Sequence, residues 1–348
     1  RQRQMCIRDR FVYYCRTLKR EQHTKRIVKS GLRALPSLGK TQIMTQCKLL
    51  ISGIALAAAC FAGCGVNNAG QSQDEQASDG TLSIVVSIVP QAYFVRRVAG
   101  ELATVEVLAP PNHTAETHQV TPRQMDTLSH ADVYFRIGMP FETPLVNRLA
   151  ASYPRLKIVD TRAGVPMLGG VCAHAHEHND HRHEGDDPHI WLDPMRVKIQ
   201  ARTIASALSA LAPQHSRTFS ENLQSFERDL DALHRRLTKI LAPVRGKIIY
   251  VYHPAFGYLA DAYGFEQRAI ETEGKSPGSK RLYEVIDEIK GAEIRAVFDQ
   301  PQFADGSVWI IAEAAGVAVI SLDALMDHYP AGMENIARAI AQAAKATS

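Results

Sequence analysis

A dense cluster of histidines lies near the middle of this chain of 348 residues. Five of them fall within ten residues, at His174, His176, His178, His181 and His183. Neutral imidazole is the side chain best suited to zinc and similar divalent metals. The surrounding residues 173–186 offer almost nothing apolar to bury, so we expect an accessory metal-binding loop rather than folded core.

A compact apolar motif follows the cluster directly. It reads DPHIWLDP from Asp187 onward, and it places His189 beside a proline and ahead of Ile, Trp and Leu, which favour burial. A histidine held in ordered structure next to many exposed imidazoles indicates metal handling, so His189 is a candidate ligand. Asp193 is better explained as the N-cap of a helix that begins near Pro194.

The cluster also contains the spacing H-x-H-x-D-H, formed by His176, His178, Asp180 and His181. Metallo-β-lactamase-like enzymes use this spacing, so a zinc-dependent hydrolase is one alternative function. A histidine-dense tract generates such spacings by chance, and no apolar strand precedes His176. The sequence contains no H-E-x-x-H. We therefore expect that the protein is not an enzyme.

The amino-terminal segment differs in charge from the rest of the chain. Residues 1–43 carry twelve Lys/Arg and two Asp/Glu, whereas the whole chain has a formal net charge of +4. The remainder is therefore net negative, and we expect no nucleic-acid binding. Because residues 1–43 show no helical or strand periodicity, we interpret them as a non-native or disordered leader, with translation beginning at Met44.

Residues 44–64 have the layout of a bacterial lipoprotein signal. A lysine supplies positive charge, residues 49–61 form a short apolar core, and two small residues precede Cys64. The core is too short for a comfortable membrane-spanning helix. We expect Cys64 to bear a lipid that anchors the protein to a membrane. Cys60 is a weaker candidate, and an ordinary cleaved signal is the alternative.

An export signal places the mature protein outside the cytoplasm, in the periplasm or on the outer cell surface. Residues 65–80 are polar, so we expect a flexible tether there. Beyond Cys64 the sequence has one further cysteine, Cys172, so the exported chain is expected to have no internal disulfide.

Strands and helices alternate along residues 81–348. The predicted strands are residues 82–89, 104–108, 131–137, 156–159, 247–252, 265–270, 296–298 and 317–321. The predicted helices end at Gly100, begin at Pro122, and lie near residues 197–211, 255–263, 280–290, 306–315 and 333–346. Alternation at this spacing predicts parallel βαβ units.

A long helix is predicted between the two halves. Apolar residues recur in steps of three and four, at Phe219, Leu223, Phe226, Leu230, Leu233, Leu237 and Ile240. We therefore expect an α/β protein with two similar lobes, residues 81–212 and 244–348, whose mostly parallel central sheets are joined by one rigid helix over residues 213–243. A single helix is a stiff connector, which predicts small hinge motion.

Four motifs occur in order along the chain: DDPHIWLDP (186–194), VYHPAFGYLADAYG (251–264), IETEGKSPG (270–278) and VFDQPQF (297–303). Together with the histidine cluster and the lipoprotein signal, they resemble the zinc/manganese ABC-transporter substrate-binding proteins, the ZnuA/TroA-like family. The resemblance covers about residues 81–348. It implies one metal ion between two lobes and delivery of that ion to an ABC permease in the membrane. We expect a monomer.

The resemblance also implies particular ligands. The family's histidines fall on His189 and His253, and its acid near the last strand falls on Asp323. The family usually has Pro-His-x-Tyr-Glu-Pro after the second strand, and this chain departs from that motif. An ungapped count places Glu116 at the histidine and His118 at the tyrosine. The first ligand therefore stays open between Glu116, which fits by position, and His118, the better zinc donor, with His113 as a third candidate.

The resemblance implies a four-coordinate site of histidines and carboxylates. A nitrogen-rich set fits Zn²⁺ better than Mn²⁺, which prefers oxygen ligands, and His253 and the histidine cluster both favour zinc. As a hypothesis, the imidazoles of residues 174–183 bind zinc weakly and raise its local concentration near the cleft. A metal-binding surface adhesin with the same fold is a further alternative function.

Overall fold

The computed structural model describes residues 80–345, except Asn112, residues 170–186, Glu273, Glu293 and residues 304–305. The described residues fall within one compact unit, Gln76–Ser348. Several predictions lie outside the described residues and stay predictions: the leader, the lipid anchor on Cys64, the tether before residue 80, and the accessory loop with His174, His176, His178, His181 and His183.

The amino-terminal lobe is built on a parallel sheet of four strands in the order β2-β1-β3-β4. Its strands are β1 (Leu82–Val86), β2 (Ala103–Val107), β3 (Val133–Arg136) and β4 (Lys157–Asp160). The connecting helices are α2 (Val89–Ala99), α3 (Pro122–Ser129) and α4 (Glu142–Ser152). Each crossover through a helix returns the chain in the same direction, as parallel pairing requires.

The carboxyl-terminal lobe repeats this plan with the strand order β6-β5-β7-β8. Its strands are β5 (Ile248–Val251), β6 (Glu266–Ala269), β7 (Ala296–Asp299) and β8 (Ala318–Ser321). Its helices are α7 (Gly257–Tyr263), α8 (Ser279–Gly291), α9 (Ser307–Ala315) and α10 (Tyr329–Lys345). Two parallel sheets with equivalent strand order confirm the predicted α/β class with two similar lobes.

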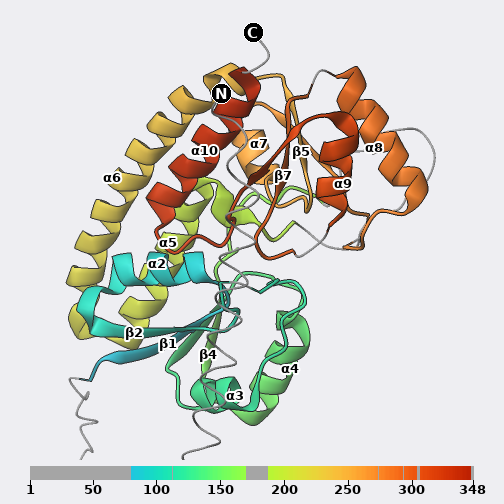
Figure 1. Ribbon diagram of the computed structural model, residues 1–348. Coiled ribbons are helices and arrows are strands. Elements are labelled where there is room, and N and C mark those ends of the chain that lie inside the picture. The colour runs from blue at the N-terminus through green and yellow to red at the C-terminus, as the bar shows by residue number, and fades with distance from the viewer. Residues whose placement is uncertain are drawn as a thin grey trace, which may run out of the picture. The chain divides into compact units, whose positions relative to one another are not determined.

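Two helices connect the sheets. Helix α5 (Pro194–Leu211) is followed by α6 (Ser216–Leu241), whose 26 residues span about 39 Å. Helix α6 packs against α2 and α5 near one lobe and against α10 near the other (Figure 1). The apolar stripe predicted from the sequence is its buried face, with Phe219, Phe226, Leu230, Leu233 and Leu237 at most 1% exposed.

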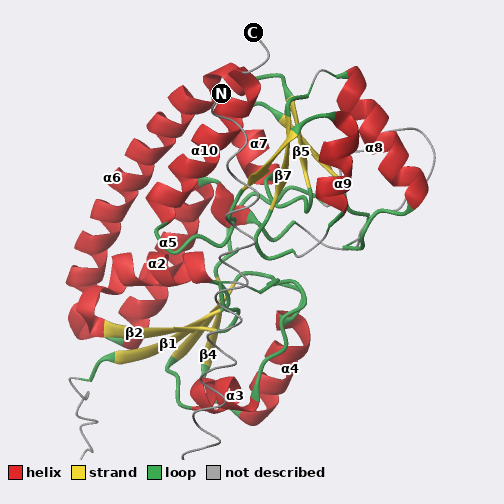
Figure 2. Cartoon of the chain, in the orientation of Figure 1, coloured by secondary structure: helices red, strands yellow, loops and turns green. Residues whose placement is uncertain are grey.

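The hydrophobic core divides according to the faces of the second sheet. Successive side chains of a strand point to opposite faces. In β5, Ile249 and Val251 therefore join a large core shared with α6, α10 and the first lobe. Tyr250 joins a smaller core beneath α8 and α9. Figure 2 shows α8 and α9 on the side of this sheet turned away from α6 and α10.

Two local predictions need correction. The strand predicted over residues 82–89 ends at Val86, and α2 begins at Val89, because Pro90 fits the first helical turn, where its missing N–H is not needed. Helix α4 was not expected from the sequence. Its only buried apolar side chains are Leu145 and Leu149, so its apolar stripe is too short to be recognised.

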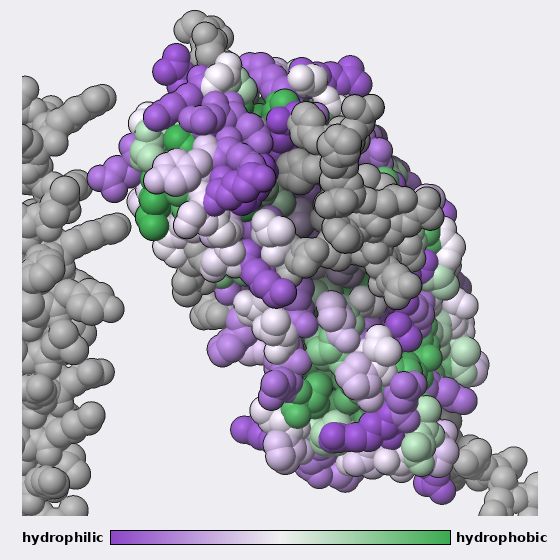
Figure 3. Space-filling view, turned by 90° about the vertical axis from the view of Figure 1, so that its right-hand side faces the viewer, coloured by the Kyte–Doolittle hydropathy of each residue, from purple (hydrophilic) through white to green (hydrophobic). Residues whose placement is uncertain are grey.

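No helix in the described part of the chain combines the length and the apolar content that a membrane span requires. Figure 3 shows the side that faces right in Figure 1, where hydrophilic and apolar side chains are mixed. The large apolar side chains exposed among the described residues are Tyr283, Trp309 and Ile310, on α8 and α9.

Candidate metal centre

Three candidate ligands lie on segments that leave the carboxyl ends of parallel strands. Glu116 lies in the loop after β2, His253 follows β5 by two residues, and His189 directly precedes the short 3₁₀ helix Ile190–Leu192 between β4 and α5. Ligands of open α/β sheets collect at these carboxyl ends. The fold therefore brings residues of both lobes to one place.

The segment around His189 is fixed by burial. Ile190, Trp191 and Leu192 are at most 1% exposed. The indole N–H of Trp191 donates to the carbonyl oxygen of Ala324 at 2.7 Å, and the Tyr329 hydroxyl donates to the carbonyl oxygen of Trp191 at 2.7 Å. These bonds join the DPHIWLDP motif to the carboxyl-terminal lobe and hold the backbone of His189.

One carboxylate and two imidazoles converge on a single point. The Nε2 atoms of His189 and His253 each lie 3.3 Å from Oε1 of Glu116, and they lie 3.4 Å from one another. Zinc bonds of about 2.0–2.1 Å at tetrahedral angles separate two ligand atoms by about 3.3–3.4 Å. The three donor atoms are therefore spaced as three ligands of one tetrahedral metal ion.

The three side chains line a small cavity of about 20 Å³, room for one ion or water. Its other walls include Trp191, Phe303 and Gln300. The ring of Phe303 stacks on His253 with the ring centroids 4.6 Å apart. These low-dielectric walls strengthen electrostatic interactions between the cavity and a cation.

The other ring nitrogen of each histidine bonds to a carboxylate of its own. Nδ1 of His189 lies 2.7 Å from Oδ1 of Asp187, and Nδ1 of His253 lies 2.8 Å from Oε1 of Glu271. Each Nδ1–H therefore donates to its carboxylate, which leaves both Nε2 atoms directed at the cavity. Gln300 also fixes His253 through two bonds to its backbone, at 3.0 and 2.7 Å.

The carboxylates around the cavity raise the pKa values of both histidines. Burial by itself would lower the pKa of His189, but Asp187 and Glu116 outweigh it and raise that pKa to about 10. Burial likewise opposes protonation of His253, whereas Glu116 and Glu271 raise its pKa overall. Burial favours a neutral Glu116, yet its bonds to both histidines hold the pKa of its carboxyl far below the usual range. A cation that binds these nitrogens must therefore displace protons.

The structure places the three candidates for the first ligand in different surroundings. Glu116 joins His189 and His253 in the one group of potential ligands that the described residues contain. His118 lies outside that group, with its ring against Phe141 at 5.2 Å. His113 is exposed. Glu116, which fits the family motif by position, therefore lies at the cavity, and His118, the better zinc donor, does not.

Asp323 is not brought into the group. It is exposed, and its Oδ1 accepts bonds from the backbone N–H of Leu325 at 2.9 Å and from Nε2 of Gln302 at 2.8 Å. Its carboxylate therefore holds its own loop. Where the sequence implied four protein ligands, the described residues bring three together.

Asp187 and Glu271 are the functional residues that sequence reasoning did not assign. Both lie inside motifs noted in the sequence, Asp187 two residues before His189 in DDPHIWLDP and Glu271 as the second residue of IETEGKSPG. The pairing of Glu271 with His253 spans eighteen residues that include α7 and β6, so sequence spacing could not reveal it. The spacing of Asp187 and His189 could have indicated a local bond.

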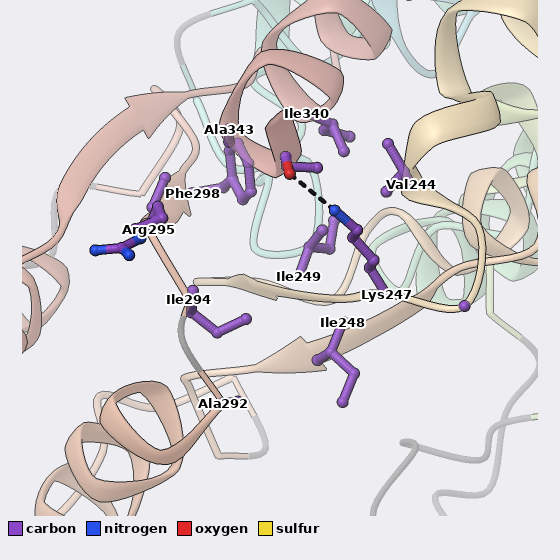
Figure 4. Close-up of a pocket in the computed structure, with 13 residues that line it drawn as sticks. Val244, Lys247, Ile248, Ile249, Ala292, Ile294, Arg295, Phe298, Ile340 and Ala343 are labelled. Atoms are coloured by element: carbon purple, nitrogen blue, oxygen red, sulfur yellow. Dashed lines mark hydrogen bonds between the residues drawn. The ribbon is translucent and has the colours of Figure 1, made fainter. Parts of the chain in front are cut away.

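A larger cavity lies at the opposite, amino-terminal edge of the second sheet (Figure 4). Its volume is about 410 Å³, and its walls are mostly aliphatic, with Lys247 and Arg295 at the strand ends. Lys247 donates to the carbonyl oxygen of Ala344 near the end of α10. None of its lining residues is a histidine, cysteine or acid, so this cavity offers no metal ligands.

The fold and the cavity together define a two-lobed α/β protein with a histidine–carboxylate site between the lobes. Residues 84–343 match the family model described as zinc-uptake complex component A, periplasmic (ZnuA). The chain belongs to this family, which confirms the resemblance found in the sequence. The family is one of transport components rather than enzymes.

Individual relatives agree with this assignment. A putative metal-binding protein of Chlamydia muridarum is 30% identical over 62% of this chain and 74% of its own length. The high-affinity zinc uptake system protein ZnuA of Yersinia pestis is 26% identical over 70% of this chain and 83% of its own. A crystal structure of a zinc-bound ZnuA deletion mutant superimposes with a TM-score of 0.69 at 35% identity, covering 76% of this chain and 98% of that one.

Proposed function

We propose that this protein captures Zn²⁺ as cargo outside the cytoplasm and delivers it to an ABC permease for uptake. The observation that carries the proposal is the spacing of Glu116, His189 and His253, whose donor atoms lie 3.3–3.4 Å apart. Membership in the zinc-uptake family and the zinc-bound relative support the choice of metal and partner.

The donor set itself favours zinc over manganese. Two imidazole nitrogens and one carboxylate oxygen are typical of tetrahedral zinc, whereas manganese prefers a larger set of oxygens. The cavity of about 20 Å³ has no room for the several water molecules that a six-coordinate ion would keep. Zinc can shed its water in exchange for three protein ligands.

Ligands drawn from both lobes suit a cargo better than a permanently held ion. Glu116 comes from one lobe and His253 from the other, so any displacement between the lobes separates two of the three ligands. Delivery to a permease would require such a separation.

Purified protein made without an affinity tag should retain one tightly bound zinc per chain after dialysis against a weak chelator. Inductively coupled plasma mass spectrometry measures the metal content, with manganese offered at the same concentration as the competitor. A preparation that retains manganese in preference to zinc, or no metal at all, would contradict the proposal.

We further propose that Cys64 bears a lipid anchor and that the histidines of residues 174–183 collect zinc near the cleft. The support is the signal layout before Cys64 and the density of imidazoles. Deleting residues 174–183 should slow zinc capture at low zinc concentration and leave one zinc bound per cleft. Stopped-flow competition with a fluorescent chelator measures the rate, and an unchanged rate would remove this role.

A further inference from the structure

One tyrosine of the carboxyl-terminal lobe bridges two neighbouring backbone segments of the amino-terminal lobe. Tyr258 lies on α7 and is 0% exposed. Its hydroxyl accepts a bond from the backbone N–H of Leu168 at 3.1 Å and donates to the carbonyl oxygen of Asp187 at 2.8 Å. The N–H of Asp187 also donates to the carbonyl oxygen of Leu168, at 3.4 Å. The hydroxyl therefore fixes the backbone of Asp187 from the opposite lobe.

The ring that carries this hydroxyl is itself held in place. The guanidinium carbon of Arg196 lies 4.6 Å from the centroid of the Tyr258 ring, a cation–π distance. Nε of Arg196 donates to the carbonyl oxygen of Pro166 at 3.0 Å, and its terminal nitrogens pair with Asp193 and Asp261. The ring has a defined position, so the direction of the hydroxyl is fixed.

Asp187 transmits this position to the metal ligand. Its Oδ1 accepts from both the backbone N–H of His189, at 2.9 Å, and from Nδ1 of the same residue, at 2.7 Å. A displacement of the Asp187 backbone therefore turns the imidazole of His189. Since Nε2 of His189 is a proposed ligand, rotation of the ring changes its distance from Glu116 and His253.

Gly257, the residue before Tyr258, lies close to the other carboxylate oxygen of Asp187. A Cβ atom on Gly257 would lie 2.9 Å from Oδ2 of Asp187 and 3.1 Å from Nε2 of Gln267. The helix backbone must therefore come close to the carboxylate, and a side chain at this position would displace it. Here the need for glycine is one of space.

We propose that Tyr258 is a positioning residue of the metal site, which sets the orientation of His189 through Asp187 and so prolongs the residence of bound zinc. The inference rests on the proposed function and deepens it. It makes the geometry of a ligand on one lobe depend on contact with the other lobe. A shift between the lobes that breaks the Tyr258–Asp187 bond loosens His189 and speeds the release of zinc.

The first test is Tyr258→Phe, which keeps the ring and removes the hydroxyl. Zinc should dissociate about tenfold faster with an unchanged association rate, the low end of the about 10–100-fold cost of losing an outer partner of a metal ligand. The visible absorption of the Co²⁺-loaded protein should also shift, because it reports ligand geometry. Tyr250→Phe is the matched control, since that hydroxyl donates to Glu288 in the same lobe, away from the site.

The second test approaches Asp187 from the opposite side. Gly257→Ala should change the Co²⁺ spectrum and speed zinc dissociation, whereas Gly291→Ala, where a Cβ meets nothing within 4 Å, should do neither. An unchanged spectrum and dissociation rate in Tyr258→Phe would overturn the inference, whatever the glycine variants do. If the unaltered protein itself fails to bind zinc, the proposed function fails instead.

Discussion

Glu116→Ala should weaken zinc binding by more than about 100-fold, because loss of even an outer partner of a metal ligand costs about 10–100-fold. The carboxylate lies 3.3 Å from the Nε2 atoms of both histidines, so its removal takes away one proposed ligand. It also leaves the two Nε2 atoms, 3.4 Å apart, without a carboxylate between them. Isothermal titration calorimetry in competition with a chelator measures the affinity.

His118→Ala is the matched control, since this residue lies two positions away in the same loop. Its ring contacts Phe141 and lies outside the group of converging donors, so zinc affinity should be nearly unchanged. Glu116→Gln, which keeps the shape and removes the charge, should fall between the two. A result in which His118→Ala loses zinc and Glu116→Ala retains it would reverse the assignment of the first ligand.

The apparent zinc affinity should fall steeply as the pH is lowered from 8 to 6. The pKa of His189 is raised to about 10, and that of His253 is raised as well, so zinc must displace at least one proton from the site at neutral pH. Each displaced proton lowers the affinity about tenfold per pH unit. Two protons would give a change of about 10⁴-fold over this range.

Calorimetry in buffers of different ionisation enthalpy counts these protons. The observed binding enthalpy should vary with the buffer's ionisation enthalpy with a slope of at least one proton released. Protonation of His189 also affects the folding stability of the protein without zinc. Its protonated form stabilises the fold fully below the ordinary pKa of 6.5, and this stabilisation is lost as the pH rises through about 10. A slope of zero and an affinity independent of pH would contradict the account.

Most of the fold followed from the sequence because its signals are local. Buried parallel strands read as short β-branched runs, and the stripe of α6 repeats over many turns, so both are visible in a single window. The strand predicted over residues 82–89 is too long because Pro90 lies in the first turn of α2, which begins at Val89. Helix α4 is not predicted from the sequence because Leu145 and Leu149 are its only buried apolar residues.

The site was less predictable, since its residues meet only after folding. His189 and His253 were recognisable from motifs that set them beside prolines, and the structure places their Nε2 atoms 3.4 Å apart. The residue types alone could not decide whether Glu116 or His118 is the first ligand, because the backbone of the loop determines which side chain faces the cavity. Asp323 has the right residue type, but its carboxylate accepts bonds from Leu325 and Gln302 instead.

The most direct test of the central claim is a crystal structure of the zinc-loaded protein with anomalous scattering measured at the zinc absorption edge. We expect one anomalous peak between the lobes, about 2.0–2.2 Å from a carboxylate oxygen of Glu116 and from Nε2 of both His189 and His253. A peak bound instead by His118 or Asp323, or no peak between the lobes, would contradict the account.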